Sequence, residues 1–217
     1  VLFFYKDAVE IILLVRPNER RKKIATRLLS AALPLFKREN INALHFSYKK
    51  DNSDWLTKCN AQYEFSAYAL SHTLGAININ PCTHNIALAT QANINDLLVL
   101  DELCFPKATL TALRIEALLT QENYDLWMIQ KNNTVIAKLH MRHFEDHSEI
   151  YDVAVHPKHQ HQGYATSLIN HALDRANKKK KMNVTLDVAS HNSNALSLYL
   201  KCGFTLITTH YYWRAAL

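Results

Sequence analysis

The chain has 217 residues, of which 48% are hydrophobic and 20% are charged, and it contains only 3 glycines and 5 prolines. This composition excludes disordered, collagen-like and low-complexity proteins, and the length allows a core without disulfide or metal staples. Lysine and arginine together number 25 against 19 aspartates and glutamates, so the formal net charge is +6. That excess suits an anionic ligand but does not by itself indicate nucleic acid, and no nucleic-acid partner is predicted.

The four cysteines, Cys59, Cys82, Cys104 and Cys202, lie 20 or more residues apart and form no CxxC pair. Their spacing fits neither a disulfide framework nor a zinc site. The longest apolar run near the start, residues 11–15, is too short for a membrane span or a signal peptide. We therefore expect no membrane partner and a cytoplasmic location. Because the chain opens at Val1 in a strand-like segment, we also expect that residues are missing upstream.

An internal repeat organises the chain. Residues 15–29 align with residues 155–169 at a shift of 140, sharing a valine, a proline, an alanine, a threonine and a leucine. Lys58-Cys59 then matches Lys201-Cys202 at a shift of 143. Two matches in order predict a duplicated unit. Only 14 residues precede Val15, where the matching segment begins. We therefore expect a truncated, degenerate unit at 1–70, a linker at 71–85 and a complete domain at 86–217.

The first elements of the second unit follow from its hydrophobic pattern. A strand is predicted at 86–89, a helix from Asn95-Asp96 to Pro106, and a second helix at about 109–119. A hairpin follows, with strands at 126–129 and 135–141 around a turn at 131–134. Another strand, 150–155, ends at Pro157.

The remaining elements alternate between helix and strand. A helix with one apolar face begins at Gly163 and ends at the cations 178–181, which suit the negative end of a helix dipole. A strand at 184–188, a helix around 195–202 and two strands at 204–209 and 211–213 complete the unit. This order predicts an α/β fold with a mixed sheet.

The loop before Gly163 is the first candidate site. Gln160-His-Gln-Gly163-Tyr-Ala165 reads QxxGxA between a strand and a helix. The amides at a helix start bind phosphate oxygens, and a residue without Cβ lets a ligand approach the backbone. The pattern therefore suits a pyrophosphate. The alternative is an ordinary helix start with a turn glycine.

Further short motifs follow in order: Val155-x-Pro157, QxxGxA, Asp187-Val188, Asn192-x-x-Ala195, Leu198-Tyr199 and Gly203-Phe204. In this order and spacing the second unit resembles the acetyl-CoA-binding half of the GNAT (GCN5-related) N-acetyltransferases. Residues 86–141 fit the family's other elements more loosely. The resemblance implies a mixed-sheet GNAT fold, preceded by a partial GNAT-like unit as in the family's tandem members.

The resemblance also implies the ligand and its contacts. Acetyl-CoA would be the co-substrate, with the strand 150–155 offering backbone groups to its pantetheine arm and the amides of 161–166 holding its pyrophosphate. The implied cofactor-binding residues are Val153, Ala154, Val155, Gln160, His161, Gln162, Gly163, Tyr164, Ala165, Thr166 and Asn192.

Tyr199 is the implied general acid. An amine attacks the thioester carbonyl, and coenzyme A leaves as a thiolate. An ordinary thiol pKa near 8.5 and a phenol pKa near 10 allow the phenol to give its proton to that thiolate. The alternative is a packing role, because Tyr199 shares a helix face with Ala195, Leu198 and Cys202.

The base is less well defined by the sequence. Asp187 lies 12 residues before Tyr199, where the ribosomal-protein N-terminal acetyltransferase branch of the family carries a glutamate. Glu149 and Asp152, beside the cofactor strand, are rivals. Each of these residues could instead be a solvated or helix-capping carboxylate.

Three loop histidines, His156, His159 and His161, have no carboxylate or thiol partner at ligand spacing, so no metal site is predicted. One protonated imidazole could instead attract phosphate. In the first unit, the positions of Gly163, Tyr199 and Gly203 are occupied by Lys23, Leu56 and Asn60. We therefore expect the first unit to bind no acetyl-CoA.

These features favour an acetyl-CoA-dependent N-acetyltransferase that works by direct attack in a ternary complex, since no cysteine lies in the motif to carry the acetyl group. The alternative is a non-catalytic acyl-CoA-binding or protein-interaction module. A basic nucleic-acid binder is a third reading that depends only on the net charge. The acceptor is a primary amine on a small molecule or peptide; the sequence identifies neither it nor the oligomeric state.

Overall fold

The computed structural model describes residues 2–4, 8–48, 53–75, 84–106 and 111–217. The chain forms two compact units: unit 1 comprises residues 1–69, 188–193 and 208–217, and unit 2 comprises residues 70–187 and 194–207. Three strands, β4 (Gln62–Thr73), β9 (Asn183–Ala189) and β10 (Thr205–Ala216), therefore contribute residues to both units. No helix in the described part of the chain is long and apolar enough to cross a membrane.

Unit 1 is a five-stranded sheet with two helices. Its elements are β1 (Leu2–Phe4), β2 (Ala8–Ile11), the 3-10 turn η1 (Pro17–Glu19), α1 (Ile24–Arg38), β3 (Ala43–Tyr48), α2 (Ser53–Lys58) and parts of β4 and β10. The strand order is β1-β2-β3-β10-β4, with β2 parallel and β10 antiparallel to β3. Phe36, Phe46 and Leu56 form the fully buried centre of its core.

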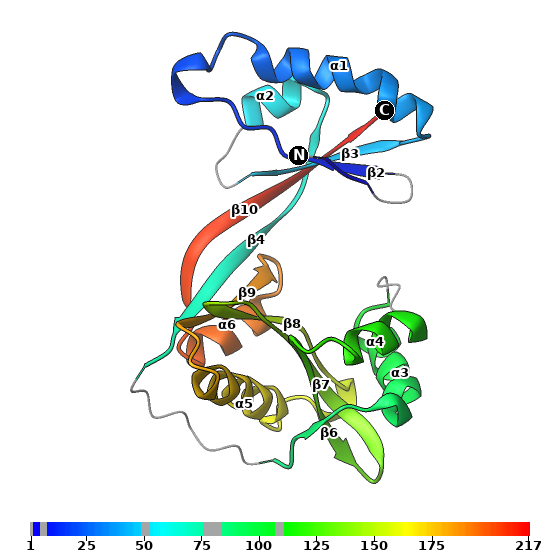
Figure 1. Ribbon diagram of the computed structural model, residues 1–217, viewed down its shortest axis with the longest axis vertical. Helices are drawn as coiled ribbons and strands as arrows, with labels where there is room; N and C mark the ends of the chain where they lie inside the picture. Colours follow the sequence, from blue (N-terminus) through cyan, green and yellow to red (C-terminus); the bar gives the residue numbers. More distant parts are fainter. Residues whose placement is uncertain (1, 5–7, 49–52, 76–83, 107–110) are drawn as a thin grey trace. The chain divides into compact units, whose positions relative to one another are not determined.

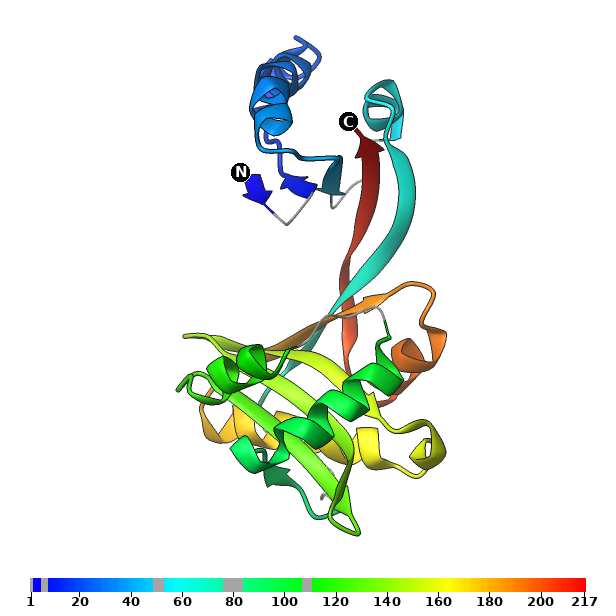
Figure 2. The same ribbon diagram turned by 90° about the vertical axis from the view of Figure 1, so that its right-hand side faces the viewer.

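Unit 2 contains the predicted site. Its elements are β5 (Ala87–Leu88), η2 (Gln91–Asn93), α3 (Ile94–Cys104), α4 (Ala112–Leu119), β6 (Tyr124–Lys131), β7 (Thr134–His143), β8 (His147–Val155), η3 (Pro157–His159), α5 (Tyr164–Lys178), β9 (Asn183–Ala189) and α6 (Ser193–Lys201). The strand order is β4-β9-β8-β7-β6-β5, antiparallel from β5 to β8 and parallel between β8 and β9. Helices α3 and α4 cover one face of β6–β8 and α5 covers the other (Figure 1). In Figure 2, α3 and α4 lie in front of the sheet of unit 2.

The observed elements follow the predicted order, with one correction. The two predicted strands at 204–209 and 211–213 are one strand, β10, which runs through the polar stretch Thr208–His210. A polar stretch without glycine or proline does not end a strand that is half exposed. The predicted helix start at Thr109 lies outside the described residues, and α4 begins after Thr111, whose side chain accepts the backbone N–H of Arg114. Residues 71–73 of the predicted linker belong to β4.

The hairpin turn has a clear local cause. Asn132 and Asn133 both have positive φ, at 51° and 60°. Two consecutive left-handed residues make the tight turn that matches the twist of the flanking strands, and asparagine tolerates this conformation better than most residues. The turn therefore sets the pairing of Gln130 and Lys131 with Val135 and Thr134, and the register shifts by one residue beyond Gln130.

Equivalent segments of the two units share their backbone conformation. Helices α1 and α5 both have 15 residues, and each follows a short 3-10 turn that begins at proline. In the loop between turn and helix, Arg21 and His161 have φ of 64° and 60°, and Lys23 and Gly163 have φ of 59° and 81°. At the shift of 143, the bounds of β4 coincide with those of β10. The sequence repeat thus corresponds to a repeat of local structure.

Lys23 carries a strain that Gly163 avoids. A left-handed conformation costs a residue with Cβ roughly 1–2 kcal/mol, partly offset by the entropy that glycine loses on folding. We therefore expect Lys23→Gly to raise the free energy of unfolding by about 0.5–1 kcal/mol in urea titrations. The neighbouring variant Lys22→Gly is the control, because Lys22 is not among the positive-φ residues, and it should lower stability through the entropy that glycine loses on folding and through loss of the exposed ion pair with Glu19. An equal loss in both variants would contradict this account.

A buried Asp–His–Ser cluster joins three strands of unit 2. His143 Nε2 lies 3.0 Å from Asp125 Oδ2, and His143 Nδ1 lies 2.8 Å from Ser148 Oγ. Ser148 is fully buried, so a substrate cannot reach its hydroxyl. The hydrogen bonds of the cluster therefore connect β6, β7 and β8 rather than forming a nucleophilic site.

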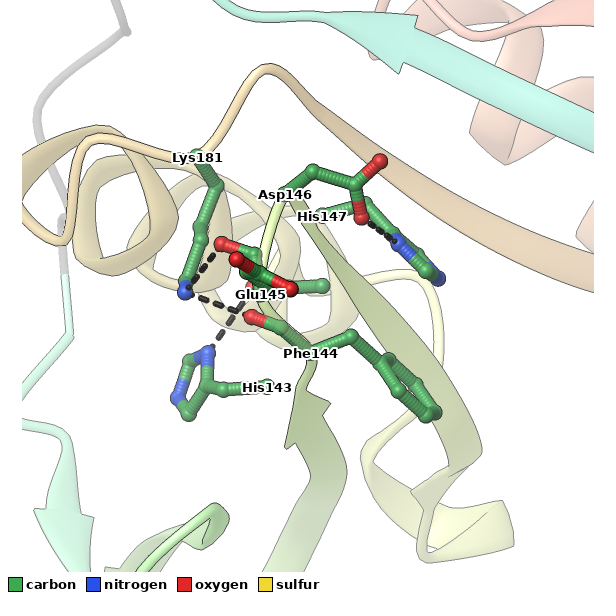
Figure 3. Close-up of polar contacts among 7 residues, drawn as sticks. His143, Phe144, Glu145, Asp146, His147 and Lys181 are labelled. Atoms are coloured by element: carbon green, nitrogen blue, oxygen red, sulfur yellow. Dashed lines mark hydrogen bonds and ion pairs between the residues drawn. The ribbon is translucent and has the colours of Figure 1, made fainter.

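In the turn that follows β7, the ammonium of Lys181 binds the carbonyl oxygens of Phe144 and Glu145 (Figure 3).

This cluster predicts an acid-sensitive contribution to stability. Burial raises the pKa of Asp125, but the hydrogen bond with His143 and the charges of Lys179 and Arg175 outweigh burial and hold this pKa below its ordinary value of 3.8. Such a carboxylate stabilises the fold above its unfolded pKa and loses that contribution as pH falls through its folded pKa. We expect Asp125→Asn to cost about 1–2 kcal/mol at pH 6 and clearly less at pH 3, measured by urea unfolding. The exposed control Glu145→Gln should show no such pH-dependent difference, and a constant penalty for Asp125→Asn would contradict the assignment.

Candidate functional site

The QxxGxA loop joins the end of β8 to the start of α5. The side-chain amide of Gln160 donates to the carbonyl of Val155 at 3.2 Å, which closes the loop onto the strand. Gly163 precedes α5 with φ 81° and ψ 0°, and the N–H of Ser167 donates to the Gly163 carbonyl at 2.9 Å. The amides before Ser167 belong to the first turn, which a helix cannot satisfy internally. They lie at the positive end of a 15-residue helix, the arrangement that binds phosphate groups.

His84 is a neighbour of this loop that the sequence did not indicate. Its Nδ1 lies 2.8 Å from Ser167 Oγ, and its ring centroid lies 4.3 Å from that of Tyr164. A Cβ built on Gly163 would lie 3.7 Å from the His84 ring, an ordinary contact. The positive φ, rather than lack of space, therefore favours glycine at position 163. Because His84 lies far from the loop in sequence and matches no motif, only the fold reveals it.

The strand β8 contains both a bulge and an unpaired stretch. Its pairing with β7 shifts between Lys138 and His140, and Asp152 has a φ of 42°. Within the described residues, the parallel pairing of β8 with β9 covers only His147–Glu149 and Asn183–Thr185. The later residues of β8, including the predicted Val153, Ala154 and Val155, therefore keep one edge that does not pair with β9. Ala154 and Val155 remain paired with β7 on the other edge.

Tyr199 is buried in α6, with 8% of its surface exposed. Its ring packs edge-to-face on Phe204 with the centroids 6.0 Å apart. Burial, followed by the charges of Cys202 and Asp152, raises the pKa of Tyr199 to about 12. The hydroxyl therefore stays protonated through the physiological range, and the charge of Asp152 acts on it.

The other predicted site residues are spread over several elements. Asp187 lies exposed on β9, and the carboxylate of Glu149 accepts a hydrogen bond from the Tyr151 hydroxyl. Asn192 lies in the turn between β9 and α6, in a stretch that belongs to unit 1, and its N–H donates to the Ala189 carbonyl at 2.8 Å. The structure thus places Gln160–Thr166 together in the loop before α5 and in its first turn, and the charge of Asp152 acts on Tyr199. It records no comparable link for Asp187.

A second polar group, here called the Lys138 chain, is buried beneath α3. It consists of Asp101 from α3, Lys138 and His140 from β7, and Tyr124 from β6. The ammonium of Lys138 is paired with the Asp101 carboxylate and lies 2.9 Å from His140 Nε2, while His140 Nδ1 lies 2.6 Å from the Tyr124 hydroxyl. Lys138 is 0% exposed and His140 1%. In the sequence, the signal for this group is the presence of three basic side chains, Lys138, His140 and Arg142, at alternate positions of β7.

Burial sets the protonation of this chain. Burial, together with the charge of Lys138, lowers the pKa of His140 well below its ordinary value, so the imidazole is neutral. Burial also raises the pKa of Tyr124 above its ordinary value, and the charge of Asp152 raises it further. For Asp101, burial raises the pKa against the opposing effect of Lys138.

The loop histidines lie close together without forming a metal site. The rings of His156 and His159 have centroids 5.5 Å apart, and the Nδ1 of His156 accepts the backbone N–H of Lys158. Across the described ranges, no group of three or more histidine, cysteine, aspartate or glutamate side chains could hold a metal ion.

Comparison with known proteins places this site in a family. The model of the acetyltransferase (GNAT) family matches residues 93–204, just over half of the chain. The [ribosomal protein bS18]-alanine N-acetyltransferase of Escherichia coli K12 is 28% identical over 87 residues, which cover 40% of this chain and 59% of that protein. The chain therefore matches less than two thirds of the length of this curated relative.

Two solved structures share the fold over nearly the whole chain. A GCN5-related N-acetyltransferase from Sphaerobacter thermophilus superposes with a TM-score of 0.81 at 13% identity, covering 99% of this chain and 75% of that chain. A tandem GNAT protein from the clavulanic acid biosynthesis pathway gives a TM-score of 0.74 at 12% identity, covering 97% and 75%. The predicted mixed-sheet GNAT fold is confirmed, as is the predicted acyltransferase class at the level of the family. The chain belongs to the acetyltransferase (GNAT) family.

Proposed function

We propose that the protein is an acetyl-CoA-dependent N-acetyltransferase that transfers the acetyl group directly to a primary amine in a ternary complex. The observation that carries this proposal is the Gly163 loop, which presents the start of α5 beyond the unpaired edge of β8 in a domain of the GNAT family. A helix start suits the pyrophosphate, and an unpaired strand edge suits the amide groups of a pantetheine arm.

In this proposal the loop and the strand hold acetyl-CoA. The amides of His161–Thr166 bind the pyrophosphate, and Val153–Val155 bind the pantetheine arm through their backbone. The contact of Asn192 with acetyl-CoA stays a prediction from the family resemblance. Gln160 acts through its hydrogen bond to the Val155 carbonyl, which keeps the loop closed on the strand. Acetyl-CoA supplies the activated thioester.

The reaction consists of one bond exchange and two proton transfers. The amine nitrogen attacks the thioester carbonyl carbon, the C–S bond breaks, and the Tyr199 hydroxyl gives its proton to the leaving sulfur. The raised pKa of Tyr199 keeps the phenol protonated when the thioester arrives but also makes it a weaker acid than a thiol of ordinary pKa near 8.5, so the proton has to move to the sulfur as the C–S bond breaks. The amine's own proton passes to a carboxylate, for which the sequence offers Asp187 and Glu149, with Asp152 as a third candidate.

Unit 1 is proposed to be a degenerate, truncated GNAT-like unit in a tandem arrangement. The shared backbone of its loop and the second unit's loop supports a common origin. Lys23 replaces the glycine, and the position of Tyr199 is taken by Leu56, which is fully buried in the unit 1 core. We therefore propose that only the second unit binds acetyl-CoA. The cytoplasmic location stays a prediction.

Calorimetry and a thiol-release assay test the proposal on the full chain. We expect acetyl-CoA to bind with one site per chain, and coenzyme A to be released in the presence of at least one amine from a panel of an N-terminal-alanine peptide, a lysine peptide and spermidine. The alanine peptide is included because the E. coli relative is named as an alanine N-acetyltransferase. Binding without turnover on any amine would instead support a non-catalytic acyl-CoA-binding module, and absence of binding would refute both.

A further inference from the structure

His84 takes no part in the mechanism proposed above, although its ring lies on the loop that is proposed to hold the pyrophosphate. It comes from the segment before β5, far from the loop in sequence, and both segments belong to unit 2. Its Nδ1 lies 2.8 Å from Ser167 Oγ, its ring centroid lies 4.3 Å from that of Tyr164, and its Cε1 lies 3.7 Å from the place of a Cβ on Gly163. The imidazole therefore spans the first turn of α5.

These contacts determine the direction of the second ring nitrogen. An imidazole is rigid, and its two nitrogens lie on either side of Cε1 and point away from each other. Because Nδ1 is directed at Ser167, Nε2 is directed away from the body of the helix, on the side of the ring next to Gly163. The amides that a helix cannot satisfy internally lie at this end of α5. His84 thus adds a side-chain nitrogen beside a set of backbone donors.

Ser167 determines which nitrogen carries the proton of the neutral ring. Its hydroxyl belongs to the buried face of α5, where the residue is 3% exposed. A serine hydroxyl can donate to an imidazole nitrogen, and a nitrogen that accepts in this way carries no proton. When the hydroxyl donates to Nδ1, the proton of the neutral ring is on Nε2. The nitrogen that points away from the helix is then a hydrogen-bond donor.

The chemistry around His84 suits an anion. The described first turn of α5 contains no acidic side chain, although acidic groups are the ones that the positive end of a helix dipole favours. The ring of Tyr164 lies between two imidazoles, those of His84 and His159, with the His159 centroid 6.4 Å away. Imidazole N–H groups, like backbone amides, donate to phosphate oxygens. A phosphate group is therefore the partner that this set of donors matches.

We propose that His84 is a further acetyl-CoA-binding residue, whose Nε2–H donates a hydrogen bond to an oxygen of the diphosphate. Ser167 is the positioning residue, because its hydroxyl holds Nδ1 and so orients the ring. The contact selects thioesters that carry the diphosphate of coenzyme A over thioesters that lack it. The inference rests on the proposed function and adds one side-chain donor to its cofactor site.

Two substitutions at position 84 separate the roles of the two ring nitrogens. The side-chain nitrogen of asparagine can take the place of Nδ1, whereas that of glutamine reaches the place of Nε2. We expect His84→Asn to weaken acetyl-CoA binding about 10- to 100-fold in calorimetry, the loss of one hydrogen bond to a charged group, and His84→Gln to recover most of the affinity. Unchanged affinity in His84→Asn would reduce the ring to a partner of Ser167, and increased affinity would show that the ring obstructs the ligand; either result would overturn the proposal.

S-acetylpantetheine identifies the part of the ligand that His84 contacts, because it has the same thioester without the diphosphate and nucleotide. Thiol release with the best amine of the panel gives kcat/KM for both thioesters. For S-acetylpantetheine, kcat/KM should differ by less than about twofold between the unaltered chain and His84→Asn, whereas for acetyl-CoA it should fall with the affinity. Equal losses with both thioesters would place the effect outside the diphosphate and overturn the proposal.

His45→Asn is the matched control. His45 is also partly exposed and also faces one polar side chain, with its Nδ1 3.6 Å from Glu64 Oε2, but it belongs to unit 1. This variant should keep the acetyl-CoA affinity of the unaltered chain. An equal loss in His45→Asn and His84→Asn would contradict a specific contact at position 84.

Nitrogen NMR of the histidines in the full chain provides a readout besides activity. In its neutral form the His84 ring should carry its proton on Nε2, Ser167→Ala should remove this preference, and acetyl-CoA should shift the Nε2 resonance more than that of Nδ1. A neutral ring with its proton on Nδ1 would overturn the proposal. Failure of the unaltered chain to bind acetyl-CoA would remove the proposed function together with this inference, whereas equal binding by the unaltered chain and His84→Asn would remove this inference alone.

Discussion

Replacement of Tyr199 by phenylalanine is expected to lower kcat for acetyl transfer by roughly two to four orders of magnitude, the usual contribution of a positioned general acid. The phenol is 8% exposed, so no water molecule has easy access to protonate the leaving thiolate in its place. Phenylalanine preserves the edge-to-face contact with Phe204, and the fold should therefore be unchanged. The measurement is coenzyme A release against amine concentration, with acetyl-CoA affinity followed by calorimetry.

Tyr63→Phe is the matched control for that experiment. Tyr63 belongs to unit 1, is 50% exposed, and also makes an edge-to-face contact, with Trp213. This variant should keep full activity. If Tyr199→Phe retained wild-type kcat, Tyr199 would be a packing residue and another group would have to protonate the sulfur.

Lys138→Met should cause the largest loss of stability among the substitutions considered, about 3–5 kcal/mol, because it leaves the buried Asp101 carboxylate without its counter-ion. One oxygen of that carboxylate, Oδ2, is buried without a hydrogen-bond partner in the described structure. The double variant Asp101→Leu/Lys138→Met removes both charges and should recover most of the loss, since hydrophobic replacement of a buried pair is often neutral or stabilising. Urea unfolding of the two variants measures the difference.

The surface pair Lys178–Asp174 provides the contrast. Its side chains are 65% and 37% exposed, so solvent screens the pair, and Lys178→Met should cost less than about 1 kcal/mol. A double variant as unstable as Lys138→Met alone would show that the charges of Lys138 and Asp101 are not the reason for the loss.

Local sequence patterns predicted most of unit 2. The one-sided apolar face from Gly163 onward predicted α5, and the scarcity of glycine made positions 163 and 203 informative; both have positive φ. These features depend on neighbouring residues along the chain, so the sequence carries them directly. The end of β10 was less predictable, because the partner strands that keep Thr208–His210 extended are distant in sequence.

The polar neighbours of the site could not be predicted in the same way. Lys138 and His140 are two positions apart in β7, but their burial depends on Asp101 of α3 and Tyr124 of β6. Likewise, His84 meets Ser167 across more than 80 residues. At the bulge, Asp152 and Val153 of β8 lie opposite the single residue Leu139 of β7, an arrangement that the sequence of one strand does not reveal.

Unit 1 combines segments that are far apart in the sequence, and this affects when it can fold during synthesis. Its sheet places the last residues of β10 between β3 and β4, so a strand that finishes near Leu217 lies in the middle of a sheet that begins at Leu2. The ribosome must therefore synthesise the chain through β10 before residues 1–69 can acquire this central strand. Until then, β3 and β4 expose unpaired edges of the kind that chaperones bind and that promote aggregation.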